Sequence, residues 1–134
     1  MSWDIVRLGD VCDVNPSTKG KLASYNSDMV VSFLPMEAME ARTGLMKPVD
    51  RKFSEVRKGY TYFENGDILF AKITPCMQNG KHAVARNLTN GIGFGSTEFH
   101  VLRPTIGVVP EWIYYIVSRT EFLTEAVNHF QGAV

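Results

Sequence analysis

The stretch Glu64-Asn-Gly-Asp-Ile-Leu-Phe-Ala-Lys-Ile73 joins a turn to an apolar run and decides the fold class. Asn65 and Gly66 both tolerate a positive φ angle, so this pair is a strong turn signal. The run 67–73 is short, rich in apolar side chains and bounded by turn formers, which is typical of a β-strand. We therefore predict a strand that begins directly after a tight turn.

The same pattern of a short apolar run beside a turn former recurs at three further places, residues 29–34, 82–86 and 99–102. Asn79-Gly80 and Asn90-Gly91 supply two more turn signals. The middle of the chain therefore predicts a β-meander or a small barrel with polar loops. A short helix is also predicted over residues 36–41.

After Pro110 the apolar residues recur with a period of 3.6, which is typical of a helix that packs on one face. Pro110 and Glu111 suit a first helical turn, and we expect a break near 118–120 and a stop at Gly132. The sequence thus predicts an α+β domain with a curved, mostly antiparallel β-sheet core and C-terminal helices. The side chains expected to bury against that core are Ile113, Ile116, Phe122, Val127 and Phe130.

A length of 134 residues and an apolar fraction of 45% fit one compact domain, residues 1–134. Cys12 and Cys76 stand far apart without a second pair, so neither a disulfide framework nor a zinc site is indicated. Two buried thiols are the simpler interpretation. No signal peptide or membrane-spanning run is present in the sequence, and we expect a cytoplasmic protein.

Charge is balanced overall but uneven along the chain. There are 14 basic and 14 acidic side chains, whereas residues 42–104 carry ten basic against five acidic ones. Six of the ten lie close together: Arg42, Lys47, Arg51, Lys52, Arg57 and Lys58. Such a segment could neutralise a DNA backbone through counterion release, or it could be an ordinary solvated surface. The residues alone leave both interpretations open.

A polar loop between 72 and 82 is the second candidate for ligand contact. Lysine can bind phosphate or guanine, and asparagine and glutamine can pair with the edge of adenine. The candidate residues in this loop are Lys72, Gln78, Asn79, Lys81 and His82. An ordinary solvated hairpin loop is the alternative.

No enzyme motif emerges from the sequence. The glycines of Gly91-Ile-Gly-Phe-Gly-Ser-Thr-Glu98 lack the spacing of a dinucleotide or phosphate-binding loop, so we expect a glycine-rich turn or bulge there. Cys76 and His82 could form a thiol and base pair, but nothing in the sequence orients them. We therefore predict no catalytic residue, no metal site and no cofactor.

Four landmarks, in order along nearly the whole chain, resemble the specificity subunits of type I restriction-modification systems. They are Trp3-Asp-Ile-Val-Arg-Leu-Gly-Asp-Val-Cys-Asp-Val-Asn-Pro16, Asn65-Gly-Asp-Ile-Leu-Phe-Ala-Lys-Ile-Thr-Pro75, Asn79-Gly-Lys81 and Gly93-Phe-Gly-Ser-Thr-Glu-Phe-His-Val-Leu-Arg-Pro104. The resemblance implies a target-recognition domain, which reads one half of a split DNA target and has no active site of its own.

The resemblance also implies partners: double-stranded DNA, a methyltransferase subunit and a restriction subunit. Members of this family continue into a spacer helix and a second recognition domain, which this sequence lacks. The chain could accordingly be a truncated product, an excised domain or a half-subunit that forms a homodimer. A regulatory domain that acts through protein contacts is the alternative function.

Shared landmarks are better candidates for the scaffold than for DNA readout, because related domains with different targets can share them. We therefore expect Gly93, Gly95, Ser96, Thr97, Glu98 and Phe99 to hold the fold. DNA contacts are expected from the segment 42–58 and the loop 72–82.

Overall fold

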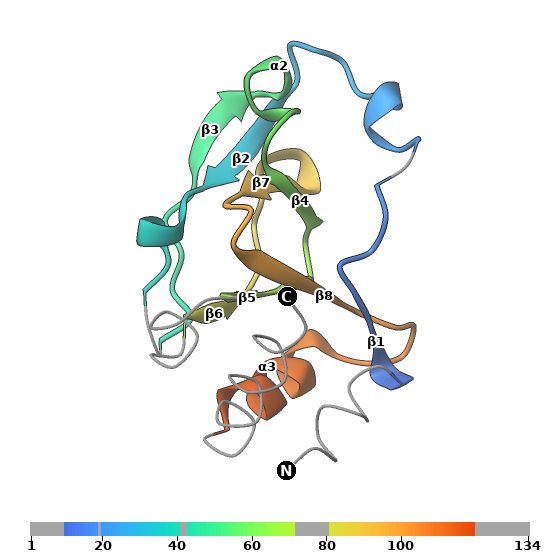
Figure 1. Ribbon diagram of the computed structural model, residues 1–134, viewed down its shortest axis with the longest axis vertical. Helices are drawn as coiled ribbons and strands as arrows, with labels where there is room; N and C mark the ends of the chain where they lie inside the picture. Colours follow the sequence, from blue (N-terminus) through green and yellow to red (C-terminus); the bar gives the residue numbers. More distant parts are fainter. Residues whose placement is uncertain (1–9, 19, 41–42, 72–80, 120–134) are drawn as a thin grey trace.

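The computed structural model describes residues 10–18, 20–40, 43–71 and 81–119, which fold as two stacked β-sheets with a helix beneath them (Figure 1). Sheet A has the order β1 (Cys12–Val14), β8 (Phe99–Pro104), β5 (Ile68–Ala71), β6 (His82–Val84). Sheet B has the order β3 (Val49–Lys52), β2 (Val30–Leu34), β7 (Ile92–Gly95), β4 (Thr61–Glu64). Every pair is antiparallel except β2–β7.

Short helical turns connect the strands. They are η1 (Leu22–Ser24), η2 (Met36–Ala38), α2 (Phe53–Val56) and η3 (Thr89–Gly91), and α3 (Pro110–Ser118) follows the last strand. The predicted fold class is confirmed, and the strands predicted at 29–34, 67–73, 82–86 and 99–102 correspond to β2, β5, β6 and β8. The helix predicted at 36–41 is only the single turn η2.

The turn at 64–67 carries the chain from sheet B into sheet A. Gly66 adopts a φ of 91°, and the Asp67 carboxylate accepts a 2.8 Å hydrogen bond from the backbone N–H of Glu64. Because β4 and β5 belong to different sheets, the β-meander, one of the two arrangements predicted for the middle of the chain, is wrong. This turn is a crossover between layers and not a hairpin within one sheet.

The glycine-rich stretch is also different from the prediction: residues 92–95 form the buried strand β7, between β2 and β4, and not a turn or bulge. A Cβ on Gly93 would lie 2.2 Å from the Phe63 ring, and one on Gly95 would lie 2.5 Å from the backbone oxygen of Leu34. Glycine is needed here because neighbouring groups occupy the space of a side chain.

Aromatic side chains are buried on both faces of sheet B. Phe53, Phe63, Phe94 and Phe99 are at most 2% exposed, and rings on β4, β7 and α2 contact one another across sheet B. Phe63 and Phe99 pack between the two sheets, whereas Phe53 and Phe94 pack on the other face of sheet B. Each such buried side chain contributes about 1.5–3 kcal/mol. Cys12 is likewise buried, as expected for one of the two thiols. Cys76 lies outside the described residues.

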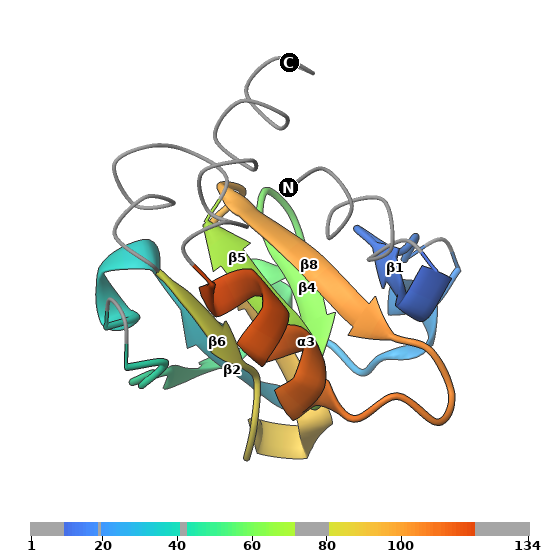
Figure 2. The same cartoon turned by 90° about the horizontal axis from the view of Figure 1, so that it is seen from below.

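Helix α3 packs on sheet A, across β5, β6 and β8 (Figure 2). Ile113 and Val117 are fully buried against Ile68, Phe70 and Leu102, and Ile116 is partly buried. Helix α3 ends at Ser118, and Arg119 is extended, as expected for a break near 118–120. The stop expected at Gly132 lies outside the described residues. Phe122, Val127 and Phe130 lie outside the described residues.

Candidate nucleic-acid interface

The basic segment forms an exposed edge of sheet B. Arg51 and Lys52 are on β3, which is the outermost strand and has no buried residue, and Arg57 and Lys58 follow α2. We call these four exposed residues the basic edge. Arg42 lies outside the described residues, and Lys47 is exposed in the loop that precedes β3.

Local packing fixes where the basic edge points. Phe53 and Val56 of α2 are buried in the core of sheet B, so the polar residues between and after them face solvent. The backbone N–H of Lys52 donates a 3.0 Å hydrogen bond to the Glu55 carboxylate at the start of the helix. The Arg57 guanidinium lies 5.2 Å from the Phe53 ring centroid, a cation–π geometry that leaves its charge accessible.

Residues on β3 alternate between two faces of the strand. Arg51 pairs with Val31 of β2, and Lys52 pairs with Val30, so the two cations project to opposite sides of the edge. Asp50 precedes them, but its carboxylate accepts a 2.7 Å hydrogen bond from the Thr89 hydroxyl. That bond ties η3 to the edge strand. An exposed strand edge with cations on both sides can lie along a phosphate backbone.

Lys47 and Lys81 form a second group, away from the basic edge. The backbone N–H of Lys47 donates to the oxygen of Ala38 at 3.0 Å, and Lys81 Nζ lies 3.4 Å from the oxygen of Met36. Both lysines are thus tied to η2. Lys72, Gln78 and Asn79 lie outside the described residues, in the loop that ends at Lys81.

His82 was expected in the polar loop with a side chain that contacts base edges. It is instead a strand residue, and its side chain is too buried to make such a contact. It begins β6, is 3% exposed and lies between the rings of Phe70 and Tyr114. The Ser118 hydroxyl donates to the backbone oxygen of Tyr114 at 2.7 Å. His82 Nε2 must then be the donor in its 2.7 Å hydrogen bond to that hydroxyl. This histidine joins sheet A to α3.

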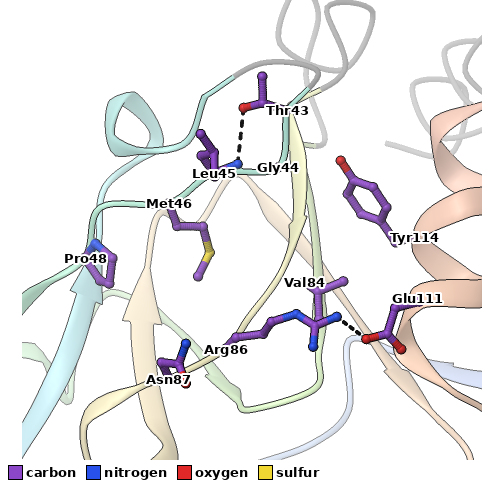
Figure 3. Close-up of a pocket in the computed structure, with 10 residues that line it drawn as sticks. All are labelled: Thr43, Gly44, Leu45, Met46, Pro48, Val84, Arg86, Asn87, Glu111 and Tyr114. Atoms are coloured by element: carbon purple, nitrogen blue, oxygen red, sulfur yellow. Dashed lines mark hydrogen bonds and ion pairs between the residues drawn. The ribbon is translucent and has the colours of Figure 1, made fainter.

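A hollow of about 570 Å³ opens between the loop 43–48, the end of β6 and α3 (Figure 3). Leu45, Met46 and Val84 give it apolar walls, and Tyr114 extends from α3 toward Gly44. Arg86 and Glu111 form an exposed ion pair on one side. Met46 and Pro48, the two sequence neighbours of Lys47, line the hollow. The hollow therefore adjoins the η2 side of the candidate interface.

A polar network around β4, at the opposite edge of sheet B from β3, couples the two sheets. Arg103 of β8 donates two hydrogen bonds to the buried Asp67 carboxylate, and its guanidinium lies 3.7 Å from Glu64 of β4. Glu64 also accepts from Lys21 at 2.5 Å and from the Tyr62 hydroxyl at 2.6 Å. Since Tyr62 donates its proton to Glu64, Tyr25 must be the donor in the 2.9 Å bond between the two phenols.

The network shifts the pKa values of its members. Burial alone would raise the pKa of Glu64, but hydrogen bonds from Lys21 and Tyr62 and the charge of Arg103 lower it below the usual value. Burial, followed by the hydrogen bonds with Glu64 and Tyr25, raises the pKa of Tyr62 well above its usual value. Glu64 therefore stays ionised and Tyr62 stays protonated at neutral pH. These residues hold structure and leave no base or acid poised near pH 7.

Two curated relatives from Escherichia coli match most of the chain. The type I restriction enzyme EcoEI specificity subunit is 39% identical over 103 residues, which are 76% of this chain and 17% of that protein. The type I restriction enzyme EcoAI specificity subunit is 39% identical over 108 residues, which are 80% of this chain and 18% of that protein.

This chain is a homologue of the type I restriction enzyme specificity subunits. The resemblance inferred from the four landmarks is thereby confirmed. The chain spans about a sixth of the length of these specificity subunits. No family model matches it.

Solved structures of type I systems share the fold. One chain, from work on complex assembly and conformational transition of the type I R-M system, superposes with a TM-score of 0.63 at 20% identity and covers 83% of this chain and 28% of its own length. The HsdS subunit from Thermoanaerobacter tengcongensis superposes with a TM-score of 0.60 at 21% identity over the same shares. The two-sheet arrangement is therefore that of specificity subunits.

The landmarks shared with specificity subunits fall largely on structural positions. Gly93, Gly95 and Phe99 are buried, and the Ser96 hydroxyl accepts a 3.0 Å hydrogen bond from the backbone N–H of Glu98. In the first landmark, the side-chain oxygen of Asn15 accepts a 2.8 Å hydrogen bond from the backbone N–H of Val101. This bond extends the β1–β8 pairing. Burial and these hydrogen bonds are expected of residues that hold the fold, whereas Thr97 is exposed.

Sequence reasoning missed several exposed polar residues beside the basic segment. Arg86, Asn87 and Asn90 are exposed, and Asn87 and Asn90 adopt positive φ angles of 55° and 56°. The Asn90 side chain donates to the oxygen of Val30 at 2.7 Å, which fixes η3 against β2. The Asn90-Gly91 pair predicted the turn that is η3. No feature of the sequence predicted that η3 lies beside β3.

Proposed function

We propose that this chain is a DNA-sequence-recognition domain of a type I restriction-modification system, which directs partner subunits to one half of a split target. The observation that carries the proposal is the 39% identity to two specificity subunits over three quarters or more of the chain. We assign the 134 residues to a single such domain. The alternative of a regulatory domain is not favoured, because both relatives are named as specificity subunits.

The exposed cations support DNA as the ligand. Arg51, Lys52, Arg57 and Lys58 are all exposed on one edge of sheet B, and Lys47 and Lys81 flank η2. With a net charge of zero, the chain has no general affinity for polyanions beyond such local clusters. We assign phosphate contacts to the basic edge, together with Arg42 and Lys47, and base contacts to Lys72, Gln78, Asn79 and Lys81.

The domain supplies recognition and not catalysis. Among the described residues no group of three or more His, Cys, Asp or Glu side chains is arranged to hold a metal ion. The acidic and phenolic groups with shifted pKa values around Glu64 are occupied by internal hydrogen bonds. We assign methylation and cleavage to methyltransferase and restriction subunits that would assemble with the domain in the cytoplasm, because both relatives are specificity subunits of type I restriction enzymes.

No helix in the described part of the chain has the length and apolarity to cross a bilayer.

Selection of bound duplexes from a random pool, at stated salt, tests the proposed function. We expect the chain, alone or with a methyltransferase partner, to enrich a short sequence block of fixed length. Enrichment of no block in either form would contradict sequence recognition. The methyltransferase partner is included because specificity-subunit homologues are components of multi-subunit enzymes, and the isolated domain alone can bind weakly.

A further inference from the structure

Three apolar side chains lie beside the basic edge, on the face of sheet B that carries α2. Phe33 of β2 pairs with Val49 of β3, so both side chains project to this face. The ring of Tyr60 meets that of Phe33 edge to face, with the ring centroids 4.8 Å apart. Tyr60 is 44% exposed and Val49 is 43% exposed, while Phe33 is half-buried. We call these three residues the Tyr60 patch.

Cations of the basic edge border the Tyr60 patch. Arg51 pairs with Val31, which is two residues from Phe33 along β2, so the Arg51 side chain projects to the same face as the patch. Lys58 is exposed and precedes Tyr60 by two residues. Figure 1 shows β3 and α2 together at the end of the molecule opposite to α3. Apolar groups between cations complement a polyanion that also offers apolar groups, and double-stranded DNA is such a ligand.

A hollow of about 340 Å³ opens next to the rings of Phe33 and Tyr60. Glu37 and Glu98 are also part of its lining. Carboxylates repel phosphate groups, whereas they can accept hydrogen bonds from the amino groups of bases. The part of DNA that fits beside the two rings is therefore the edge of a base pair and not the sugar-phosphate backbone.

We propose that the Tyr60 patch reads thymine, through contact of the Tyr60 ring with the 5-methyl group in the major groove. This inference rests on the proposed DNA recognition and adds a second reading site to the loop 72–82. The thymine methyl is the apolar group that a base pair presents in the major groove, and it distinguishes A·T from G·C pairs. Arg51 and Lys58 bind the phosphates that border the groove, which holds the patch against the bases.

The size and surroundings of the Tyr60 patch favour DNA over a protein partner. Three side chains, one of them half-buried, supply only a fraction of the about 800 Å² per partner that a standard protein interface buries. The centre of a protein interface is depleted of charged residues, whereas charged residues of both signs enclose this patch. A methyl group, by contrast, needs only the area of a single ring.

Replacement of thymine by deoxyuracil, which lacks only the 5-methyl group, tests the proposal directly. The duplex is the one selected by the chain with its methyltransferase partner, and its thymines are replaced one at a time. We expect replacement at one or two positions to weaken binding about fourfold, which corresponds to the about 0.8 kcal/mol for burial of one methyl group. Tyr60→Ala should weaken binding to the thymine duplex by a similar factor and remove the difference between thymine and uracil.

Two further variants serve as controls. Tyr60→Phe keeps the ring and should retain the difference between thymine and uracil, which separates a contact by the ring from a hydrogen bond by the hydroxyl. Tyr115→Ala removes another exposed ring, 65% exposed on α3, and should change neither the affinity nor the difference. Circular dichroism checks that each variant is folded.

Three results would overturn the proposal: a selected target without thymine, a target in which no uracil replacement weakens binding, or a difference between thymine and uracil that survives in Tyr60→Ala. In each of them the unmodified chain still prefers the selected duplex to a scrambled one, so the proposed DNA recognition stands. Absence of that preference in the unmodified chain would instead contradict the proposed function, and this inference with it.

Discussion

The Arg103 guanidinium makes two parallel hydrogen bonds of 2.9 Å, from Nε and Nη2, to the two carboxylate oxygens of Asp67. The Asp67 side chain is only 2% exposed, whereas that of Arg103 is 23% exposed. The hydrogen bond to Asp67 is the largest cause of the raised pKa of Arg103. Because Asp67 also closes the turn between β4 and β5, this pair fixes the junction of the two sheets.

Substitution of one partner should therefore destabilise the fold strongly. Arg103→Met leaves the Asp67 carboxylate buried without its paired charge, and we expect a loss of about 3–5 kcal/mol in the free energy of unfolding. Urea denaturation followed by circular dichroism measures it. Arg86→Met is the matched control, since its partner Glu111 is on the surface and exposed pairs contribute little. Equal stability of the two variants would show that the Arg103 pair does not hold the junction.

Gly93→Ala tests the close approach of β7 to β4. The new methyl group would overlap the Phe63 ring, so we expect destabilisation of about 1–3 kcal/mol. Phe63→Leu should relieve the overlap, and the double variant should lose less than the sum of the two single losses. Additive losses in urea denaturation would show that the two residues do not compete for the same space.

Stability should decrease in acid because of Glu64. Its pKa is lowered in the folded protein, so its contribution is fully present above the unfolded value, near 4.5, and is lost as the pH falls through the lower folded value. Glu64→Gln should therefore flatten the dependence of the free energy of unfolding on pH below about 4.5. Denaturant titrations at several acidic pH values measure this slope. An unchanged slope in the variant would assign the acid sensitivity to other carboxylates.

Cys12 should resist alkylation in the folded protein. Burial, with a smaller effect of the nearby Asp13 charge, raises the pKa of its thiol to about 11, so almost no thiolate is present at neutral pH. In a Cys76→Ser chain we expect iodoacetamide to react slowly without denaturant and rapidly in urea, as followed by mass spectrometry. Rapid reaction of the native chain would mean that β1 opens readily.

The parts of the fold with strong sequence signals were predictable. The Asn65-Gly66 turn, β2, β5 and α3 combine turn formers or a 3.6-residue period with apolar runs, and each signal is local. By contrast, β3 has the sequence Val-Asp-Arg-Lys with no buried residue, so it is a strand only because it pairs with β2. Its placement could not be read from residues 49–52 alone.

The sequence predicted which cationic residues form the candidate site, but not how all the candidate residues are arranged in space. The excess of cations in 42–58 marked the basic edge, since exposed charge needs no tertiary partner. His82 was misplaced because its neighbours Phe70, Tyr114 and Ser118 are distant in sequence and enclose it only in the folded chain. For the same reason the glycines of β7 were interpreted as a turn: Phe63 and Leu34, which require them, lie elsewhere in the sequence.

The two groups of candidate DNA-binding residues should affect binding differently. Replacement of Arg51, Lys52, Arg57 and Lys58 by glutamine should weaken binding to all duplexes alike and reduce the salt slope by about 0.9 for each phosphate that is no longer neutralised. Substitution of Gln78, Asn79 or Lys81 should instead cost about 1–3 kcal/mol for each base that is no longer bound and relax preference at one or two positions. Titrations at several salt concentrations, with a methyltransferase partner, separate the two effects. Variants of both groups that behave like the unmodified chain would place the DNA elsewhere.

The most direct measurement is the affinity for a selected duplex compared with a scrambled duplex of the same base composition, at about 50 and 200 mM salt. Sequence recognition predicts a preference of at least about a thousandfold for the selected duplex in the assembled complex. It also predicts that this preference remains at the higher salt while both affinities fall. Equal affinity for the two duplexes at both salt concentrations would contradict the proposal that this domain reads DNA sequence.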